Sequence, residues 1–418
     1  KNVLWHDNEK FTSKDVVFTY EKIIDPKVFN SIKSNFKEVK SVRAIDDFTI
    51  EVIYLNPYFK AIEIWMVGML PKHLLENEEN LMTSSFNKNP IGTGSYILKE
   101  FKIGQDIELY ANNNYFEGKP KIDKILYQFL PDSNTSFLYL KQNKLDIGGL
   151  SPIQIDRQID NEFKSNYKII EKPSFSYTYL GFNLKNEKFK NKDIREALSL
   201  AVNREELVNI LFFGHGEVCN GPFLPGSFAY NSDVKTIKQN INKSKELLNK
   251  HGFNEKNPFT FEVVTNTGND IRINAAQILQ YQLAKAGIIM KIRVMEWQAF
   301  LNTVVHPRNF EAVILGWSLA LMPDAYSIWH SSSAKLGGFN LVNYKNKKVD
   351  ELIEKGSITI DRNELGTIYK QIFKHISDDL PYLFLYMPNS ISVVNNQIKN
   401  IEPSFVGIMH NQKDWIKE

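Results

Sequence analysis

The chain has 418 residues, of which 43% are hydrophobic and 24% are charged. This composition is typical of folded proteins, and the length exceeds what one hydrophobic core usually supports, so two or three domains are expected. The formal net charge of +3 arises from 51 basic and 48 acidic residues. Because these charges are spread along the chain without a basic cluster, nucleic acid is not an expected partner.

No apolar run approaches the roughly 20 residues that a membrane-spanning helix needs. The chain has one cysteine, Cys219, which excludes internal disulfides and metal sites built on cysteine pairs. We expect this thiol to be buried and inert. Residues 1–5 contain no charged segment followed by an apolar one, so no targeting sequence is visible, and we expect that processing or truncation removed the true start.

The first hundred residues predict an α+β region. Thr12 followed three residues later by Asp15 resembles a capping box, and apolar spacing over residues 16–24 predicts a short helix. Alternation over residues 48–54 predicts a strand. Residues 90–96 contain one proline and two glycines, which predict a turn leading into a further strand.

A β–α–β rhythm follows. Residues 122–131 read as a strand, residues 135–143 as a helix, and residues 177–183 as another strand. Asp193 is the predicted cap of a helical stretch whose apolar positions continue to Gly214.

A second α/β block begins with a predicted strand over residues 261–264. It continues with a helix over residues 271–283 that Gly287 closes, and with strands over 290–294 and 310–317. Glycines and prolines at residues 221–226 separate the two blocks. The pattern therefore predicts two α/β lobes joined by extended crossings.

No motif predicts catalysis or a cofactor. The eight histidines include no pair at helical metal-site spacing, and the chain lacks G-x-S-x-G, H-E-x-x-H and P-loop motifs. Adjacent carboxylates such as Asp378 and Asp379 are typical of solvated pairs. Aromatic residues instead concentrate in the second block, where they either build a core or line a cleft, and both readings stay open for Trp317. These residues are Trp297, Trp317, Tyr326, Trp329, Phe339 and Tyr344.

Several motifs resemble those of the family 5 bacterial extracellular solute-binding proteins, which bind oligopeptides, dipeptides or nickel. The opening Trp5-His6-Asp7-Asn8, with the segment from Phe11 to Phe18, is similar to the family pattern W-x-D-G-x-x-F-T-A-x-D-V-V-F. Other landmarks follow in family order as far as residue 382. They include Pro90 to Tyr96, Gly181-Phe182-Asn183, Asp193 to Leu198, Gly316-Trp317, Pro323-Asp324, Gly338-Phe339-Asn340 and Asp379 to Tyr382.

This resemblance implies an α/β, two-lobed clamshell fold of the class II periplasmic-binding-protein type, with an additional inserted α+β domain. The implied boundaries are residues 1–112 for the smaller inserted domain with part of lobe 1, 113–228 and 396–418 for the discontinuous lobe 1, and 229–395 for lobe 2. Family members carry a further N-terminal segment.

The resemblance also implies a monomeric extracytoplasmic protein that captures peptides, with oligopeptides favoured, and delivers them to the permease subunits of an ABC importer. Such binders hold the ligand main chain with strand-like hydrogen bonds. The implied location is the periplasm or the outer face of the cytoplasmic membrane, with a lipid anchor as an option. No enzymatic activity and no cofactor are expected.

By resemblance, seven residues are candidates for ligand contact: Trp297, Arg272, Trp317, Ser318, Ala320, Phe339 and Asn340. Arg272 lies near positions that meet the ligand carboxylate in related peptide binders, although it could also be a solvated residue of a first helical turn. Asn340 follows two glycines and could equally form a turn.

The chain departs from the resemblance at one position. Peptide binders of this kind usually place an aspartate a few residues after Gly-Trp, where it pairs with the ligand α-ammonium. Here residues 318–322 contain no acid, and Asp324 is the first to follow. Either Asp324 or another acid takes this role, or the ligand amine stays solvated.

Two alternatives remain. The first is a nickel or metal-chelate binder of the same family, for which His410 is one possible ligand. The second is an enzyme on the same fold, which no motif in the sequence supports.

Overall fold

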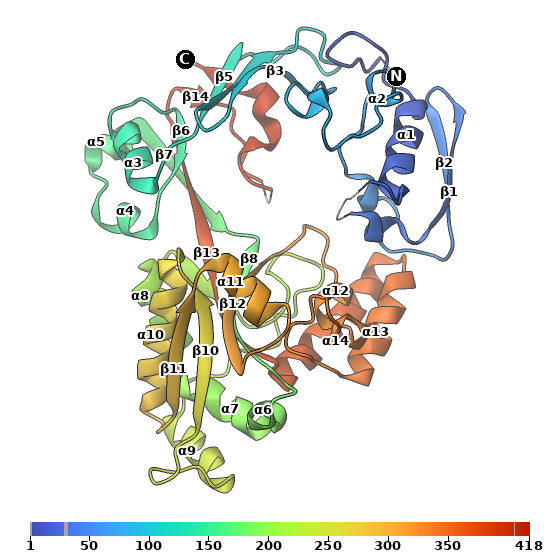
Figure 1. The fold of residues 1–418 in the computed structure, drawn as a ribbon. Helices are drawn as coiled ribbons and strands as arrows, with labels where there is room; N and C mark the ends of the chain where they lie inside the picture. The colour runs from blue at the N-terminus through green and yellow to red at the C-terminus, as the bar shows by residue number, and fades with distance from the viewer. Residues whose placement is uncertain (1, 29–31, 405) are drawn as a thin grey trace. The chain divides into compact units, whose positions relative to one another are not determined.

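The computed structural model describes residues 2–28, 32–404 and 406–418, which form a mixed α/β fold, as the sequence predicts. The chain divides into two compact units (Figure 1). Unit 1 comprises residues 1–170 and 391–418, and unit 2 comprises residues 171–390. The described residues include no helix long and apolar enough to cross a membrane. The three-domain boundaries implied by resemblance stay a prediction.

Unit 1 opens with the predicted capped helix α1 (Ser13–Ile24). The backbone N–H of Thr12 donates to the Asp15 carboxylate at 2.8 Å, which completes the capping box. The helix packs on an antiparallel hairpin of β1 (Val39–Asp46) and β2 (Thr49–Tyr54). A small core of Tyr20, Ile23, Phe36, Val39 and Ile64 fills the space between them.

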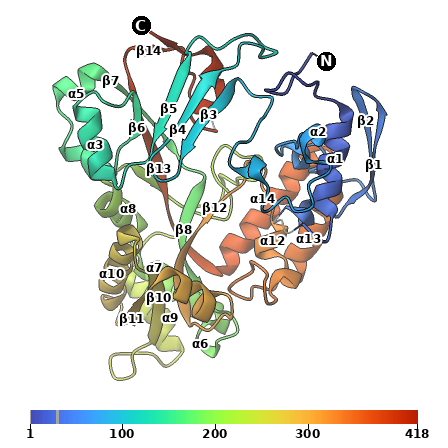
Figure 2. The same cartoon turned by 45° about the horizontal axis from the view of Figure 1, so that its top comes forward.

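The next part of unit 1 is an antiparallel sheet of β3 (Tyr96–Lys102), β4 (Asp106–Ala111) and β5 (Lys124–Gln128), whose strands lie side by side in Figure 2. The remaining helices of unit 1 are short: α2 (Lys72–Leu75), α3 (Ser133–Lys141), α4 (Pro152–Arg157) and α5 (Asn161–Asn166). The other strands are β6 (Ile147–Gly149), β14 (Ile398–Lys399) and β15 (Ile416–Lys417), together with the first residues of β7 (Tyr167–Pro173), which continues into unit 2. Four 3₁₀ turns complete the unit: η1 (Lys33–Phe36), η2 (Glu63–Trp65), η3 (Ser85–Asn87) and η6 (Met409–Asp414).

Unit 1 contains a hollow of about 1000 Å³ between β5 and β6. Its charged lining residues are engaged with protein partners: Lys124 with Glu108, Asp146 with Lys417, Asp132 as the cap of α3, and Lys144 over the Tyr139 ring. The hollow therefore offers mainly apolar surface, because its charged side chains already interact with other residues of the protein.

Unit 2 is built on a sheet in the strand order β11, β10, β12, β8, β13. Strand β10 runs parallel to both β11 and β12, whereas β8 runs antiparallel to both β12 and β13. The strands are β8 (Ser176–Phe182), β10 (Thr260–Asn266), β11 (Ile289–Met295), β12 (Ala312–Ser318) and β13 (Tyr382–Asn395), and the short β9 (Gly216–Val218) also pairs with β13. The sequence predicted β8, β10, β11 and β12, and these predictions are confirmed.

Helices α7, α8 and α10 pack on one face of this sheet around a large apolar core. The helices of unit 2 are α6 (Glu187–Lys190), α7 (Lys192–Ala201), α8 (Arg204–Phe212), α9 (Ile241–Lys250), α10 (Asp270–Ala284), α11 (Trp297–Phe300), α12 (Tyr326–Trp329), α13 (Lys347–Ile358) and α14 (Arg362–Asp379), with the turns η4 (Leu301–Val305) and η5 (Ser331–Ser333). Asp193 was predicted to cap the helix there, but Asn191 is the cap, because its side chain accepts from the Asp193 N–H at 2.9 Å. The single predicted stretch is two helices, since Asn203 caps α8.

The two α/β blocks predicted from the sequence share one sheet. Strands β8 and β12 are antiparallel neighbours over their whole length. The glycine and proline segment at residues 221–226 lies inside unit 2 and does not coincide with either boundary between the units. The sequence pattern could not show that the two blocks share a sheet, because strand pairing across about 130 residues leaves no local signal.

The other face of the sheet carries stacked aromatic rings. The rings of Tyr179 and Tyr382 stack with centroids 3.8 Å apart, and Trp329 packs on Tyr382 at 4.8 Å. Tyr177 contacts Phe384 edge to face at 5.5 Å. This cluster places several tyrosine hydroxyls in the interior.

These tyrosines predict loss of stability in alkali. Burial raises the pKa of Tyr382 and Tyr386 to about 12, and raises the pKa of Tyr177 and Tyr179 well above the ordinary value. The tyrosines of the unfolded chain lose their protons from about pH 10. The contribution of the buried, neutral tyrosines to the free energy of unfolding is therefore fully present below that pH and falls between about pH 10 and 12. We expect about 1 kcal/mol lost per tyrosine by pH 11. Denaturant titrations at pH 8 and pH 11 measure this loss of unfolding free energy, and tyrosinate absorbance follows the ionisation of the tyrosines. An unfolding midpoint that is the same at both pH values contradicts the prediction.

Candidate ligand-binding site

A cavity of about 250 Å³ opens in unit 2 at the carboxyl ends of the parallel strands β10 and β12. Open α/β sheets bind ligands at this edge, because loops and helix N-termini converge there. Strand β10 ends at Asn266, and a short turn containing Gly268, at φ +76°, leads into α10. The cavity is lined by Ser176, Tyr177, Thr178, Phe212, Asn269, Ile271, Arg272, Gly316, Trp317, Ser318, Tyr386 and Pro388.

Among the described residues that line this cavity, Arg272 alone carries a charge. It lies in the first turn of α10, where its backbone N–H donates to the capping side chain of Asn269 at 3.0 Å. Its guanidinium makes one hydrogen bond with the described residues, from Nη1 to Asn266 Oδ1 at 2.9 Å. The buried Nε has no partner among the described residues. A guanidinium has five N–H donors, so the remaining donors of Nη1 and Nη2 are not used by this part of the chain.

The surroundings of Arg272 are apolar and aromatic rather than acidic. Burial lowers its pKa from the ordinary arginine value, and Tyr386 and Tyr179 oppose this shift only in part. A Cβ at Gly316 would lie 3.2 Å from Arg272 Nη2 and 2.9 Å from the Tyr177 carbonyl oxygen. The glycine of the Gly-Trp pair therefore leaves the space that the guanidinium needs.

Trp317 ends the aromatic stack and borders the cavity. Its ring lies nearly parallel to Tyr179 at 6.3 Å, and its Nε1 donates to the Tyr382 hydroxyl at 3.4 Å. Phe339 meets it edge-on at 6.0 Å and is 57% exposed. Trp317 is partly buried. The two readings left open by the sequence therefore both apply, since the indole packs against the core and also lines the cavity.

The other candidates occupy different positions. Ser318 is exposed and lines the cavity at the end of β12, and Ala320 is exposed just beyond it. Trp297 begins α11, is 38% exposed, and contacts the Phe300 ring rather than Trp317. Arg272, Trp317 and Ser318 thus meet in one cavity, whereas Ala320, Phe339 and Trp297 lie outside its lining.

Asn340 is completely buried and holds a turn together. Its Nδ2 donates to the carbonyl oxygens of His330, at 3.2 Å, and Tyr344, at 2.8 Å. Its Oδ1 accepts from the Tyr344 N–H at 2.9 Å. Both amide N–H groups are used and the side chain is completely buried, so we do not include Asn340 in the proposed site.

Asn340→Ala is expected to lower the free energy of unfolding by about 2–3 kcal/mol, because it removes the side-chain partners of the buried Tyr344 N–H and carbonyl and one of the two donors to the His330 carbonyl. Chemical denaturation measures the loss. The exposed Asn363→Ala, which removes a side chain on the first turn of α14, serves as a control and is expected to stay within about 0.5 kcal/mol. Equal stability of the two variants would contradict the assignment.

Sequence reasoning missed Thr178, Asn269 and Tyr386. A cap at Asn269 was readable from Asn266-Thr267-Gly268-Asn269, which has the residues of a strand-to-helix turn. Thr178 and Tyr386 come from strands far away in the sequence and carried no local signal. Asp324, considered for the ligand ammonium, is not in the lining, and its Oδ1 accepts from the Tyr326 N–H at 2.9 Å.

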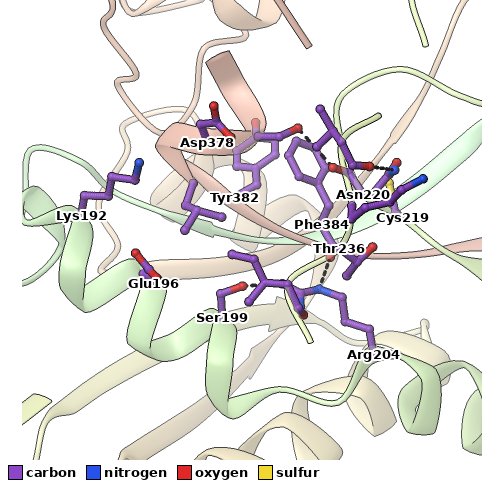
Figure 3. Close-up of a pocket in the computed structure, with 15 residues that line it drawn as sticks. Lys192, Glu196, Ser199, Arg204, Cys219, Asn220, Thr236, Asp378, Tyr382 and Phe384 are labelled. Atoms are coloured by element: carbon purple, nitrogen blue, oxygen red, sulfur yellow. Dashed lines mark hydrogen bonds between the residues drawn. The ribbon is translucent and has the colours of Figure 1, made fainter. Parts of the chain in front are cut away.

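A second cavity of unit 2, of about 220 Å³, provides a contrast (Figure 3). Here Arg204 is buried, and each of its guanidinium nitrogens donates to a protein acceptor: Nε to Phe384 O at 2.8 Å, Nη1 to Ile237 O at 3.1 Å, and Nη2 to Ser199 Oγ at 2.8 Å. Burial raises the pKa of neighbouring Cys219 to about 12, in keeping with the inert thiol that was predicted. Arg204 is therefore part of the framework, unlike Arg272.

The described residues contain no group of three or more histidine, cysteine, aspartate or glutamate side chains that could hold a metal ion. His410, the residue considered for nickel, is exposed in η6 of unit 1. Fold and site thus define a binding protein of mixed α/β architecture, with one cationic side chain in its candidate cavity.

Comparison with known proteins agrees with this class. The family of "Bacterial extracellular solute-binding proteins, family 5 Middle" matches residues 1–339. The chain is 35% identical over 433 residues to the oligopeptide-binding protein AppA of Bacillus subtilis, covering 99% of this chain and 79% of AppA. The chain therefore belongs to the family 5 bacterial extracellular solute-binding proteins, as its motifs indicated.

Two solved structures share the two-lobed fold of this family. AppA of Bacillus subtilis, in complex with a nonapeptide, matches with a TM-score of 0.81 and 33% identity, covering 100% of this chain and 85% of AppA. NikZ of Campylobacter jejuni, in complex with Ni(L-His), matches with a TM-score of 0.84 and 31% identity, covering 100% of this chain and 86% of NikZ.

Proposed function

We propose that this protein captures peptides and delivers them to the permease of an ABC importer, without catalysing a reaction. One observation carries the proposal: the partly buried guanidinium of Arg272, at the carboxyl edge of the unit 2 sheet, makes one hydrogen bond with the described residues and leaves its other donors unpaired among them. A peptide carboxylate matches such a fork with paired, charge-assisted hydrogen bonds. Two similar proteins add support, since AppA is named for oligopeptides and was solved with a nonapeptide.

The partly buried Trp317 supplies an apolar wall for ligand side chains, and exposed Ser318 ends the strand beside it. The exposed Phe339, Ala320 and Trp297 lie outside the cavity lining, and we propose that they contact longer ligands. Contacts of this kind tolerate many side chains, because rings and water adapt to different shapes. Broad peptide specificity follows from this arrangement.

We place the working protein outside the cytoplasmic membrane, as a monomer in the periplasm or on a lipid anchor, with the permease subunits as its protein partners. Extracytoplasmic placement agrees with the family to which the chain belongs. Binding in such a system shifts an equilibrium between conformations only by the difference in ligand affinity between them.

Native mass spectrometry of the protein as purified tests the proposal. A spread of bound masses that sequencing identifies as peptides is the expected result, and isothermal calorimetry with one recovered peptide then gives its Kd. Protein that carries no peptide and binds none from a mixed peptide library would overturn it.

A nickel chelate is the second candidate, favoured by the likeness to NikZ, which was solved with Ni(L-His). Because the described residues hold no metal-binding cluster, the metal would have to arrive inside a chelate whose carboxylate meets Arg272. Metal analysis of the same purified sample distinguishes this candidate, since it requires stoichiometric nickel together with a small chelator.

A further inference from the structure

Strand β5 of unit 1 has one edge without a partner strand. It is the outer strand of the sheet β3, β4, β5 and pairs only with β4. The Phe129 N–H, at the end of β5, donates to the Gln105 carbonyl oxygen on the β4 side at 2.8 Å. Because backbone groups alternate in direction along a strand, those of Leu126 and Gln128 face away from β4. No described residue forms a hydrogen bond with these outward groups.

Strand β6 has a free edge of the same kind. The sheet order of unit 2 continues from β13 to β6, where it ends, and β6 pairs only with β13. The Leu150 N–H donates to the Ile391 carbonyl oxygen at 3.0 Å, so the backbone groups of Ile147 and Gly149 face the side opposite to β13. These groups also lack a hydrogen-bond partner within the described part of the chain.

Both free edges border the same hollow. The lining of the hollow of about 1000 Å³ includes residues 124–128 of β5 and 147–149 of β6. The chain order β5, α3, β6 is that of a β-α-β unit, whose two strands normally lie in one sheet, but here they belong to different sheets. One further strand in the hollow would pair with both edges and join the two sheets.

The two edges are not protected against pairing. Exposed edge strands are usually guarded by charged side chains or prolines, whereas β6 consists of one isoleucine and two glycines. On β5, Leu126 is 46% exposed and Tyr127 is 38% exposed. The charged side chains of the lining already have partners, so the hollow matches an apolar strand without charges of its own.

We infer that the hollow holds one extended strand of this protein's own chain, from a part that lies outside residues 1–418. No strand of the described residues pairs with either free edge. The solved chains of AppA and NikZ, of which this chain covers 85% and 86%, contain residues that have no counterpart here. A strand of about five residues, the usual length, is sufficient to pair with both edges. We expect it to be apolar on both faces, as strands inside a sheet are.

Photo-crosslinking in the full-length product of the gene identifies the occupant of the hollow. A photoreactive phenylalanine analogue replaces Leu126 in one variant and Leu138 in the matched control, because Leu138 of α3 is 51% exposed and does not line the hollow. After irradiation, position 126 is expected to be joined to an apolar segment outside residues 1–418, in a product that migrates as a monomer. Position 138 is expected to give no such product.

Hydrogen exchange of the unmodified full-length protein provides a readout that needs no substitution. The amides of Leu126, Gln128, Ile147 and Gly149 are expected to exchange at least about 100-fold more slowly than in an unstructured peptide, because the added strand accepts hydrogen bonds from both edges. The inference concerns the fold of unit 1, so these results do not depend on the ligand of the protein.

Several results would overturn the inference. They are a crosslink from position 126 to a second copy or to another molecule, the same product from position 138, and exchange of the four amides at the rate of an unstructured peptide. A full-length protein that has no residues outside 1–418 would overturn it as well.

Discussion

Arg272→Met is expected to weaken peptide binding at least about tenfold while leaving the free energy of unfolding unchanged or slightly higher. The charge-assisted bonds lost from a ligand carboxylate are worth about 1.5–3 kcal/mol, and about 1.4 kcal/mol is tenfold in Kd. The folded protein loses only the bond from Nη1 to Asn266 Oδ1. It is also relieved of a partly buried charge, whose desolvation lowers the pKa of Arg272.

Calorimetry with a recovered peptide gives the affinity, and denaturant titration of the ligand-free protein gives the stability. Arg293→Met is the control. Arg293 Nη2 and Glu262 Oε1 lie 2.9 Å apart in a half-exposed ion pair, and neither residue lines the cavity. Unchanged affinity in Arg272→Met, or an equal loss in Arg293→Met, would remove Arg272 from the site. Loss of stability with loss of binding would instead make it a framework residue.

Three arginines of unit 2 illustrate how framework and function are told apart. Arg195 donates to four backbone carbonyls, of Phe189, Lys190, Asp379 and Leu380. Arg204 uses all three guanidinium nitrogens on protein acceptors, and Arg272 uses one. Because buried polar groups are normally satisfied, the arginine with unused donors, Arg272, is the one that we propose for ligand binding.

Features with a local cause were predictable from the sequence. The capping box of α1, the strand alternation of β2, and the length of α10 up to Gly287 all depend on residues within one turn or one strand. Family motifs carried the family assignment for the same reason, since they are short and appear in order. Arg272 was a candidate through the family resemblance, and the strand, turn and helix that place it in the first turn of α10 were predicted from local pattern.

Features set by long-range pairing were not predictable. Strands β8, β12 and β13 meet in an antiparallel register that joins residues near 180, 315 and 383, and this register brings Thr178 to Arg272 and Tyr382 to Trp317. Asn340 was predicted as a ligand contact because an asparagine after two glycines is equally typical of a ligand-binding loop and of a structural turn. Only the fully occupied amide of Asn340 in the folded chain separates the two.

Arg204→Met is expected to cost about 3 kcal/mol of unfolding free energy without loss of ligand selectivity. The substitution leaves the carbonyls of Phe384 and Ile237 without their donor inside the protein, and each buried orphan costs about 1–3 kcal/mol. Relief of the buried charge offsets part of this, since burial lowers the pKa of Arg204 to about 10. Arg204→Lys is expected to recover little, because one ammonium cannot reach three acceptors that a planar fork spans.

Denaturant midpoints of both variants, set against Arg293→Met, measure this cost, and the ratio of Kd values for a peptide with a free carboxyl terminus (acid) and for its C-terminal amide reports on the site. Arg204 joins α8 to β13 through Phe384, and to α7 through Ser199, so its removal loosens the layer behind the aromatic stack (Figure 3). A stability within about 0.5 kcal/mol of the parent protein would mean that the network is dispensable. A changed acid-to-amide ratio would mean that Arg204, and not Arg272 alone, sets the charge that the ligand meets.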